Sequence, residues 1–130
     1  MSFTYTYSVR TNKSVMESVS AVKESLAKNG FGTLWELDVP AKLKEKGADF
    51  QGEAVILEVC NPHHAKNALE ANLQVIYFLP CKVVVFKEGQ MTSIGMMLPS
   101  VMMETLGDPS LKAFALEVEA TLMTAIDMAV

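Results

Sequence analysis

The sequence changes from strand chemistry to helix chemistry within one stretch, residues 55–69 (VILEVCNPHHAKNAL). An apolar, β-branched run ends at Cys60. Asn61-Pro62 follows, which joins a good N-cap to a residue whose fixed φ suits the first helical turn. The sequence therefore predicts a strand over 54–60 and a helix over 63–71. Together with residues 79–86 (LPCKVVVF), this region contains both cysteines and both histidines of the chain.

Local signals also predict the elements before this stretch. Large apolar residues alternate with polar ones over 3–10 and again over 31–39, which is the period of a half-buried strand. Between them, Ser14-Val15-Met16-Glu17 forms a capping box, and Asn29-Gly30 is a helix stop. In the second strand one face is expected to carry five residues: Phe31, Thr33, Trp35, Leu37 and Val39.

The rest of the chain gives weaker signals. Residues 41–46 are expected to form a short helix. Residues 73–87 are expected to be extended, with a break at Pro80 because proline removes a strand donor. A turn at 88–90 then predicts an antiparallel return, and Asp108-Pro109 predicts the start of a C-terminal helix.

This order of strands and helices, with at least one hairpin, predicts an α+β fold. We expect a mixed, largely antiparallel sheet with helices packed mainly on one face. A length of 130 residues, half of them apolar, fits a single compact domain over 1–130.

Composition argues against several classes of protein. The net charge of −4 disfavours a nucleic-acid surface. No apolar run reaches the roughly 20 residues that a membrane span needs, and the N-terminal sequence lacks the pattern of a signal peptide. We therefore expect a cytoplasmic protein whose two cysteines are thiols.

Several motifs resemble domain-of-unknown-function family three hundred and two. They are CNP at 60–62 and LPC at 79–81 before a VVV strand, with support from 31–32, 36–39 and 43–47. The resemblance covers roughly 3–106 and implies a small α+β domain, often dimeric, without an assigned function. This chain departs from the family pattern at Glu58, at Lys82 and at the pair His63-His64.

The candidate ligand or thiol site consists of Cys60, Asn61, His63 and Cys81. Cys60 lies just before a helix N-terminus, which would favour its thiolate. The alternative is that both cysteines are small buried hydrophobes at strand ends. If the chain returns beside the strand that ends at Cys60, the two thiols meet at one end of the sheet. A parallel crossover would separate them.

Other chemistry is less well supported by the sequence. No cofactor is predicted. Zinc or copper could use Cys60, His63 and Cys81, and His64 is an additional candidate. Glu36 and Asp38 share a strand face and could hold a cation together with Glu58, although a solvated strand face is the simpler interpretation. One residue of Met96-Met97 should be buried, and the other should be available to an interface.

The function that we expect is binding of a ligand or a partner by a homodimer, without catalysis. Apolar residues on more than one side of the C-terminal helix suggest an interface there. The candidate interface residues are Leu111, Leu116, Ala120 and Met123. The alternative function is thiol-dependent redox or sulfur-transfer chemistry at Cys60, with Cys81 as its partner.

Overall fold

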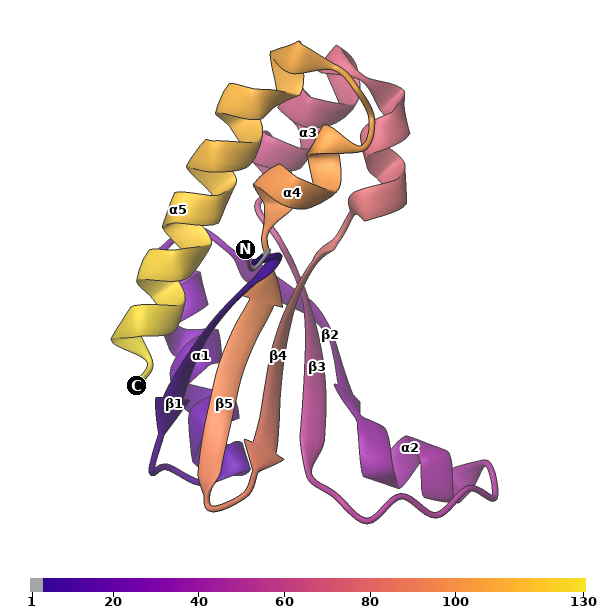
Figure 1. The fold of residues 1–130 in the computed structure, drawn as a ribbon, viewed down its shortest axis with the longest axis vertical. Coiled ribbons are helices and arrows are strands. Elements are labelled where there is room, and N and C mark those ends of the chain that lie inside the picture. The colour runs from indigo at the N-terminus through magenta and orange to yellow at the C-terminus, as the bar shows by residue number, and fades with distance from the viewer. Residues whose placement is uncertain (1–3) are drawn as a thin grey trace.

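The computed structural model describes residues 4–130, so the first residue of the strand expected over 3–10 lies outside the described part. The described strands form one five-stranded sheet in the order β1-β5-β4-β3-β2, and every neighbouring pair is antiparallel (Figure 1). The strand bounds are β1 (Thr6–Thr11), β2 (Gly32–Asp38), β3 (Ala54–Cys60), β4 (Cys81–Glu88) and β5 (Met91–Met97).

The α+β prediction is confirmed, and the described sheet is more regular than expected because it has no parallel pair. A parallel pair could have formed between β1 and β2, which are connected by the helix that follows β1. This helix carries the chain from one edge of the sheet to the other, so these two strands are not neighbours.

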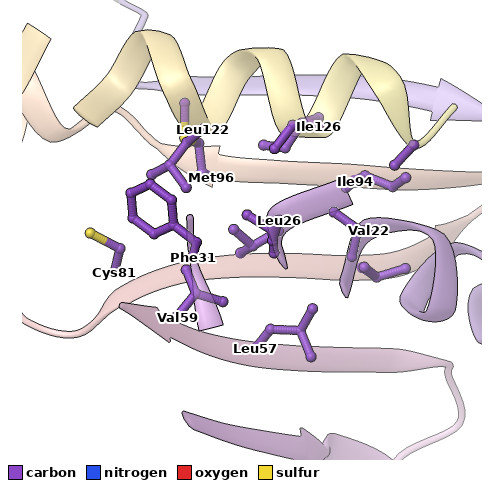
Figure 2. Packing of buried hydrophobic residues seen from close by; sticks show 14 of the residues in the cluster. Val22, Leu26, Phe31, Leu57, Val59, Cys81, Ile94, Met96, Leu122 and Ile126 are labelled. Carbon is purple, nitrogen blue, oxygen red and sulfur yellow. The ribbon is translucent and has the colours of Figure 1, made fainter. Parts of the chain in front are cut away.

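Two helices, α1 (Val15–Lys28) and α5 (Lys112–Met128), cover one face of the sheet. The predicted capping box begins α1: the Ser14 hydroxyl accepts from the Glu17 N–H, and the Glu17 carboxylate accepts from the Ser14 N–H. Between the helices and the sheet lies the main core (Figure 2). Its large buried side chains include Val22, Leu26, Phe31, Leu57, Val59, Ile94, Leu122 and Ile126.

A second, smaller cluster lies beyond one end of the strands. It is built from α3 (Pro62–Ala71), η1 (Leu73–Phe78), α4 (Pro99–Glu104) and η2 (Pro109–Leu111), together with the first turns of α5. Its buried residues are Ala68, Val75, Met103, Leu111 and Ala115.

The prediction of an extended chain over 73–80 is wrong. This stretch begins with the 3₁₀ helix η1, because the Asn72 side chain accepts a hydrogen bond from the Gln74 N–H at 2.9 Å. Only Val75 of the turn is fully buried, and it is part of the second cluster. The strand prediction holds from Cys81 onward.

The predicted side-chain pattern of β2 fails at one point. The pairing with β3 shifts between Thr33 and Trp35, which leaves Leu34 as a bulge. Thr33 pairs with Val59 and therefore shares the helix-covered face, whereas Trp35 pairs with Glu58 on the other face. The extra residue thus places Trp35 and Thr33 on opposite faces, although simple alternation put them together.

We call the sheet face that α1 and α5 leave uncovered the open face. Strand register assigns to it a largely apolar group, Trp35, Leu37, Ala54, Ile56, Val84, Phe86, Met91, Gly95 and Met97, and a polar group, Thr6, Ser8, Arg10, Glu58, Lys82, Glu88 and Ser93. The prediction for the methionine pair is confirmed: Met96 is 3% exposed in the core, and Met97 is 46% exposed on the open face.

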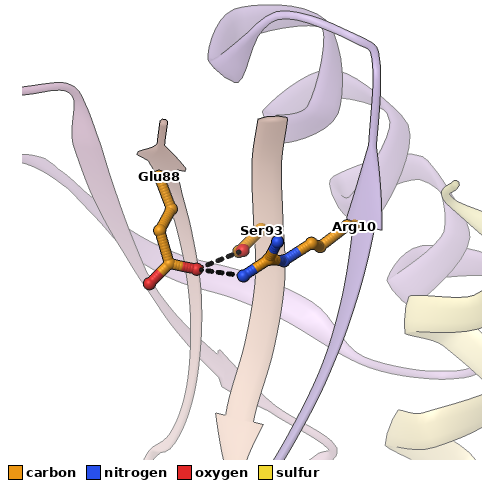
Figure 3. A network of polar contacts seen from close by, with 3 residues as sticks. All are labelled: Arg10, Glu88 and Ser93. Carbon is orange, nitrogen blue, oxygen red and sulfur yellow. Dashed lines mark hydrogen bonds and ion pairs between the residues drawn. The ribbon is translucent and has the colours of Figure 1, made fainter. Parts of the chain in front are cut away.

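A polar group crosses three strands at the hairpin end of the open face (Figure 3). Nη2 of Arg10 lies 3.0 Å from Oε1 of Glu88, and the Ser93 hydroxyl donates to the same oxygen at 3.5 Å. Both charged side chains are largely solvent-exposed, so this pair contributes little to stability.

We call residues 39–53 the arm. They contain α2 (Val39–Glu45) and extend away from the end of the sheet opposite the second cluster (Figure 1). No residue of α2 is buried, and every residue from 41 to 53 is exposed.

Candidate functional site

The structure brings Cys60 and Cys81 to the same end of the sheet. β4 runs antiparallel beside β3, and Cys81 pairs with Val59, the neighbour of Cys60. Both cysteines are free and both line a small cavity between β3, α3 and α5. Of the two layouts that the sequence left open, the structure has the one with both cysteines at the same end of the sheet. The cavity measures only about 10 Å³, which is the lower limit for a single water, so no larger ligand fits between them.

Cys81 is chemically protected. Burial raises the pKa of its thiol from 9.0 to about 11, and the nearby Cys60 and Glu58 add to this shift. The low dielectric of the site disfavours the thiolate, which is the nucleophilic form. Cys81 thus behaves as a small core residue, and the thiol-dependent alternative finds no support in it.

This protection predicts a slow thiol. In a Cys60→Ser variant at pH 8, we expect the folded chain to react with Ellman's reagent at least about tenfold more slowly than the same chain in guanidinium, because burial, the largest cause of the raised pKa of Cys81, remains in this variant and lowers the share of thiolate. Equal rates in the folded and denatured chains would contradict the assignment. Since the folded thiol keeps its proton to a higher pH than the unfolded one, its contribution to stability falls as pH rises from 9 to 11.

The histidine that lines this cavity is His64, whereas the predicted candidate His63 does not line it. Pro62 begins α3, so the two histidines point about 100° apart, and His63 remains exposed. The His64 ring packs edge-on against Phe31 and Phe114, with centroids 6.1 and 6.0 Å away. Its Nε2 lies 3.8 Å from the Glu117 carboxylate, and its Nδ1 is buried without a hydrogen-bond partner among the described residues.

Asn61 has a structural role. Its side-chain oxygen accepts from the His64 N–H at 3.0 Å and caps α3, as Asn-Pro predicted. Its amide nitrogen also lies against Gly30, where an added Cβ would come within 3.0 Å of it. With both sides of the side chain in contact with the fold, Asn61 has little room to meet a ligand.

The three candidate carboxylates do not converge. Glu36 lies on the helix-covered face and pairs with Lys23 at 2.8 Å. Asp38 lies on the same face, as predicted, but it caps α2 by accepting from the Ala41 N–H. Glu58 is on the open face, opposite Lys82 in the strand register.

Metal binding at the predicted residues is not supported by this geometry. Across residues 4–130, no group of three or more His, Cys, Asp or Glu side chains lies close enough to share an ion. His63 is turned to solvent, so Cys60, His63 and Cys81 do not form a ligand set.

A larger groove lies elsewhere, between α4, η2 and the start of α5. It has a volume of about 440 Å³, and its apolar floor includes Met103, Leu111 and Ala115. Sequence reasoning missed it. The only available signal was the second helical stripe on α5, which we attributed to a partner chain.

Two of the four residues in that predicted interface are used within the chain itself. Leu111 is 1% exposed in the second cluster, and Met123 packs against the main core. Ala120 and Leu116 are both exposed, so these two members of the predicted C-terminal interface lie on the surface. The helix is apolar on several sides because it contacts both α1 and α4.

The open face is the most distinctive surface of the molecule. Trp35 is 53% exposed, and with Met97 it flanks the half-buried side chains of Ile56, Val84 and Phe86. A sheet that is covered on one side normally carries polar residues on the other. This face is instead apolar at its centre, which is typical of an association surface.

These features define a small α+β domain with a helix-covered antiparallel sheet and one apolar open face. The chain belongs to the family described as Domain of unknown function DUF302, which matches residues 7–129. This finding confirms the resemblance drawn from the sequence.

A solved structure is similar over nearly the whole chain. It is the crystal structure of an uncharacterized conserved protein DUF302 from Bacillus stearothermophilus, with 43% sequence identity and a TM-score of 0.93. The match covers 97% of this chain and 98% of that one. No curated protein matches the chain. Across residues 4–130, no helix is long and apolar enough to cross a membrane.

Proposed function

We propose that this protein is a binding domain that works as a homodimer, with a second copy docked on the open face. The observation that carries the proposal is the apolar centre of that face, which is flanked by the half-exposed Trp35 and Met97 and which no element among residues 4–130 covers. Removing this apolar surface from water would favour association.

The size of the open face suits a dimer. Five strands about 4.8 Å apart and about seven residues long make a face of roughly 24 by 23 Å, or about 550 Å² for each copy. Two such faces together bury about 1,100 Å², which exceeds the roughly 1,000 Å² expected of a specific interface.

The charges on the open face are self-complementary. Arg10 and Glu88 lie near one end, and Lys82 and Glu58 lie toward the other, so both signs are present in equal number. A two-fold axis pairs each surface with its own copy, which requires such a balance. The edge at β2 is less suitable, because its bulge disturbs the row of backbone groups that another strand would need.

A cytoplasmic setting is part of the proposal. Both cysteines are free thiols although they lie near each other, as expected of a chain that works in a reducing compartment.

The proposal predicts that Val84→Lys dissociates the dimer. Val84 lies at the centre of the open face, opposite Ile56 and Gly95, and a charge there would be buried against its own symmetry mate. We expect sedimentation or light scattering to show a dimer for the wild type and a single 14.2 kDa chain for the variant at micromolar concentration.

The matched control is Met16→Lys, which places the same charge on an exposed position of α1, away from the open face. It should remain a dimer. A wild-type protein that sediments as single chains, or a Val84→Lys variant that stays dimeric, would contradict the proposal.

A further inference from the structure

The arm is an ordered segment that lacks a core of its own. Phe50 is 48% exposed and Leu43 is also exposed, and the arm contains no buried side chain to which either could belong. Fixing the backbone of such a segment costs conformational entropy that burial normally offsets. A long excursion of this kind is usually functional.

Local bonds keep the arm in one conformation. Asp38 caps its helix, Lys42 and Glu45 form an ion pair at 3.3 Å, and the Ala48 N–H donates to the Leu43 carbonyl at 2.8 Å. The Phe50 ring lies over Gly52, where an added Cβ would approach ring atoms to 2.8 Å. The aromatic ring therefore lies against the backbone at Gly52 and remains about half exposed.

A second exposed apolar strip lies at the opposite end of the molecule. It consists of Leu73, Ile76 and Tyr77 of η1, and Tyr77 is 78% exposed. In Figure 1, η1 is the salmon turn between α3 and β4, at the upper right, and the arm is at the lower right. Both surfaces thus lie to the right of the strands in this view, one beyond each end of the strands.

We propose that in the dimer the arm of each copy packs against η1 of the other copy. The inference rests on the proposed association through the open face. A two-fold axis between the two faces that runs across the strands turns the second copy end over end. Its arm then lies beside η1 of the first copy, and the reverse contact forms at the same time.

This choice of axis accounts for both exposed strips. An axis along the strands would instead carry the arm to the side of β1 and β5, where the end of the open face carries the charged pair Arg10–Glu88. Only the axis across the strands places Phe50 and Leu43 against the apolar side chains of η1. Each arm would thereby extend the interface beyond the sheet.

The test is a double-mutant cycle with the variants Phe50→Ser and Tyr77→Ser and the double variant. The dimer dissociation constant of each is measured by sedimentation over a range of concentrations. Each variant should weaken the dimer by about tenfold or more, because the two-fold axis makes the contact occur twice. The double variant should be little weaker than either single one, since both remove the same contact. Met16→Ser, an exposed apolar position on α1, is the control and should leave the constant unchanged.

The outcomes separate the two proposals. A wild-type protein that is a single chain at every concentration overturns the association through the open face and the arm contact with it. A stable dimer whose dissociation constant changes less than threefold in Phe50→Ser overturns the arm contact alone. The arm contact is also overturned if the fold-change in the dissociation constant of the double variant equals the product of the two single fold-changes, because the two residues would then act at separate places.

Discussion

Replacing Phe31 by alanine is expected to lower the free energy of unfolding by about 3–5 kcal/mol. Phe31 directly follows the helix stop of α1, its side chain is 2% exposed, and its N–H donates to the Leu26 carbonyl. Figure 2 shows its ring among core residues that include Val59, Cys81 and Leu122. Alanine would leave a cavity that these β-strand and helix side chains cannot close, because their backbones are fixed by the sheet and by α5.

A smaller change at the same position gives the control. Phe31→Leu keeps most of the volume and should cost less than about 1.5 kcal/mol. Both variants can be measured by chemical unfolding at one fixed chain concentration. Phe31→Ala should also speed the reaction of Cys81 with Ellman's reagent, since the ring lines the same cavity as that thiol. A loss of less than 1 kcal/mol for Phe31→Ala would contradict the central place of this ring.

Elements with a local signal could be predicted from the sequence. The capping box at Ser14 and the Asn61-Pro62 pair define helix starts through side-chain bonds that form within three residues. The strand predicted over 54–60 also agrees with β3. Buried and half-buried residues alternate along its whole length, so its pattern is that of a regular strand. Such signals need no knowledge of the rest of the chain.

Elements that depend on distant contacts could not be predicted. The run Leu73–Phe78 has the β-branched and aromatic residues of a strand, yet it is helical, since Asn72 caps it and Val75 packs into the second cluster. The bulge at Leu34 is a property of the pairing between β2 and β3. Nothing in the local sequence distinguishes it from regular alternation.

The candidate site also depends on contacts between distant parts of the chain. That Cys60 and Cys81 lie near each other depends on whether two strands are neighbours, and the sequence left both layouts open. The sequence could not show which histidine lies beside the cysteines, because one helical step separates the exposed ring of His63 from that of His64, which is packed between Phe31 and Phe114. The open face was missed as an interface because it collects residues from several strands, and only the register brings Trp35 and Val84 to one side.

A side chain at Gly95 is expected to destabilise the protein, and this prediction tests how closely β1 approaches β5 in the sheet. It lies in β5 between β4 and β1, opposite Val84 on one side and Ser8 on the other. A Cβ at Gly95 would come within 2.9 Å of the Tyr7 carbonyl oxygen and 3.0 Å of the Ser8 Cβ. The first of these contacts is with backbone that the β1–β5 ladder holds in place, so β1 would have to move.

Gly95→Ala is therefore expected to destabilise the protein by about 1–3 kcal/mol, because the steric cost exceeds the gain from restricting the unfolded chain. Gly32→Ala is the matched control: it is also a strand glycine, but an added Cβ there meets no atom within 4 Å. It should be neutral or stabilising by up to about 1 kcal/mol. Unfolding curves at equal chain concentration would show the opposite signs, and equal effects of the two substitutions would mean that β1 does not approach β5 as closely as the structure places it.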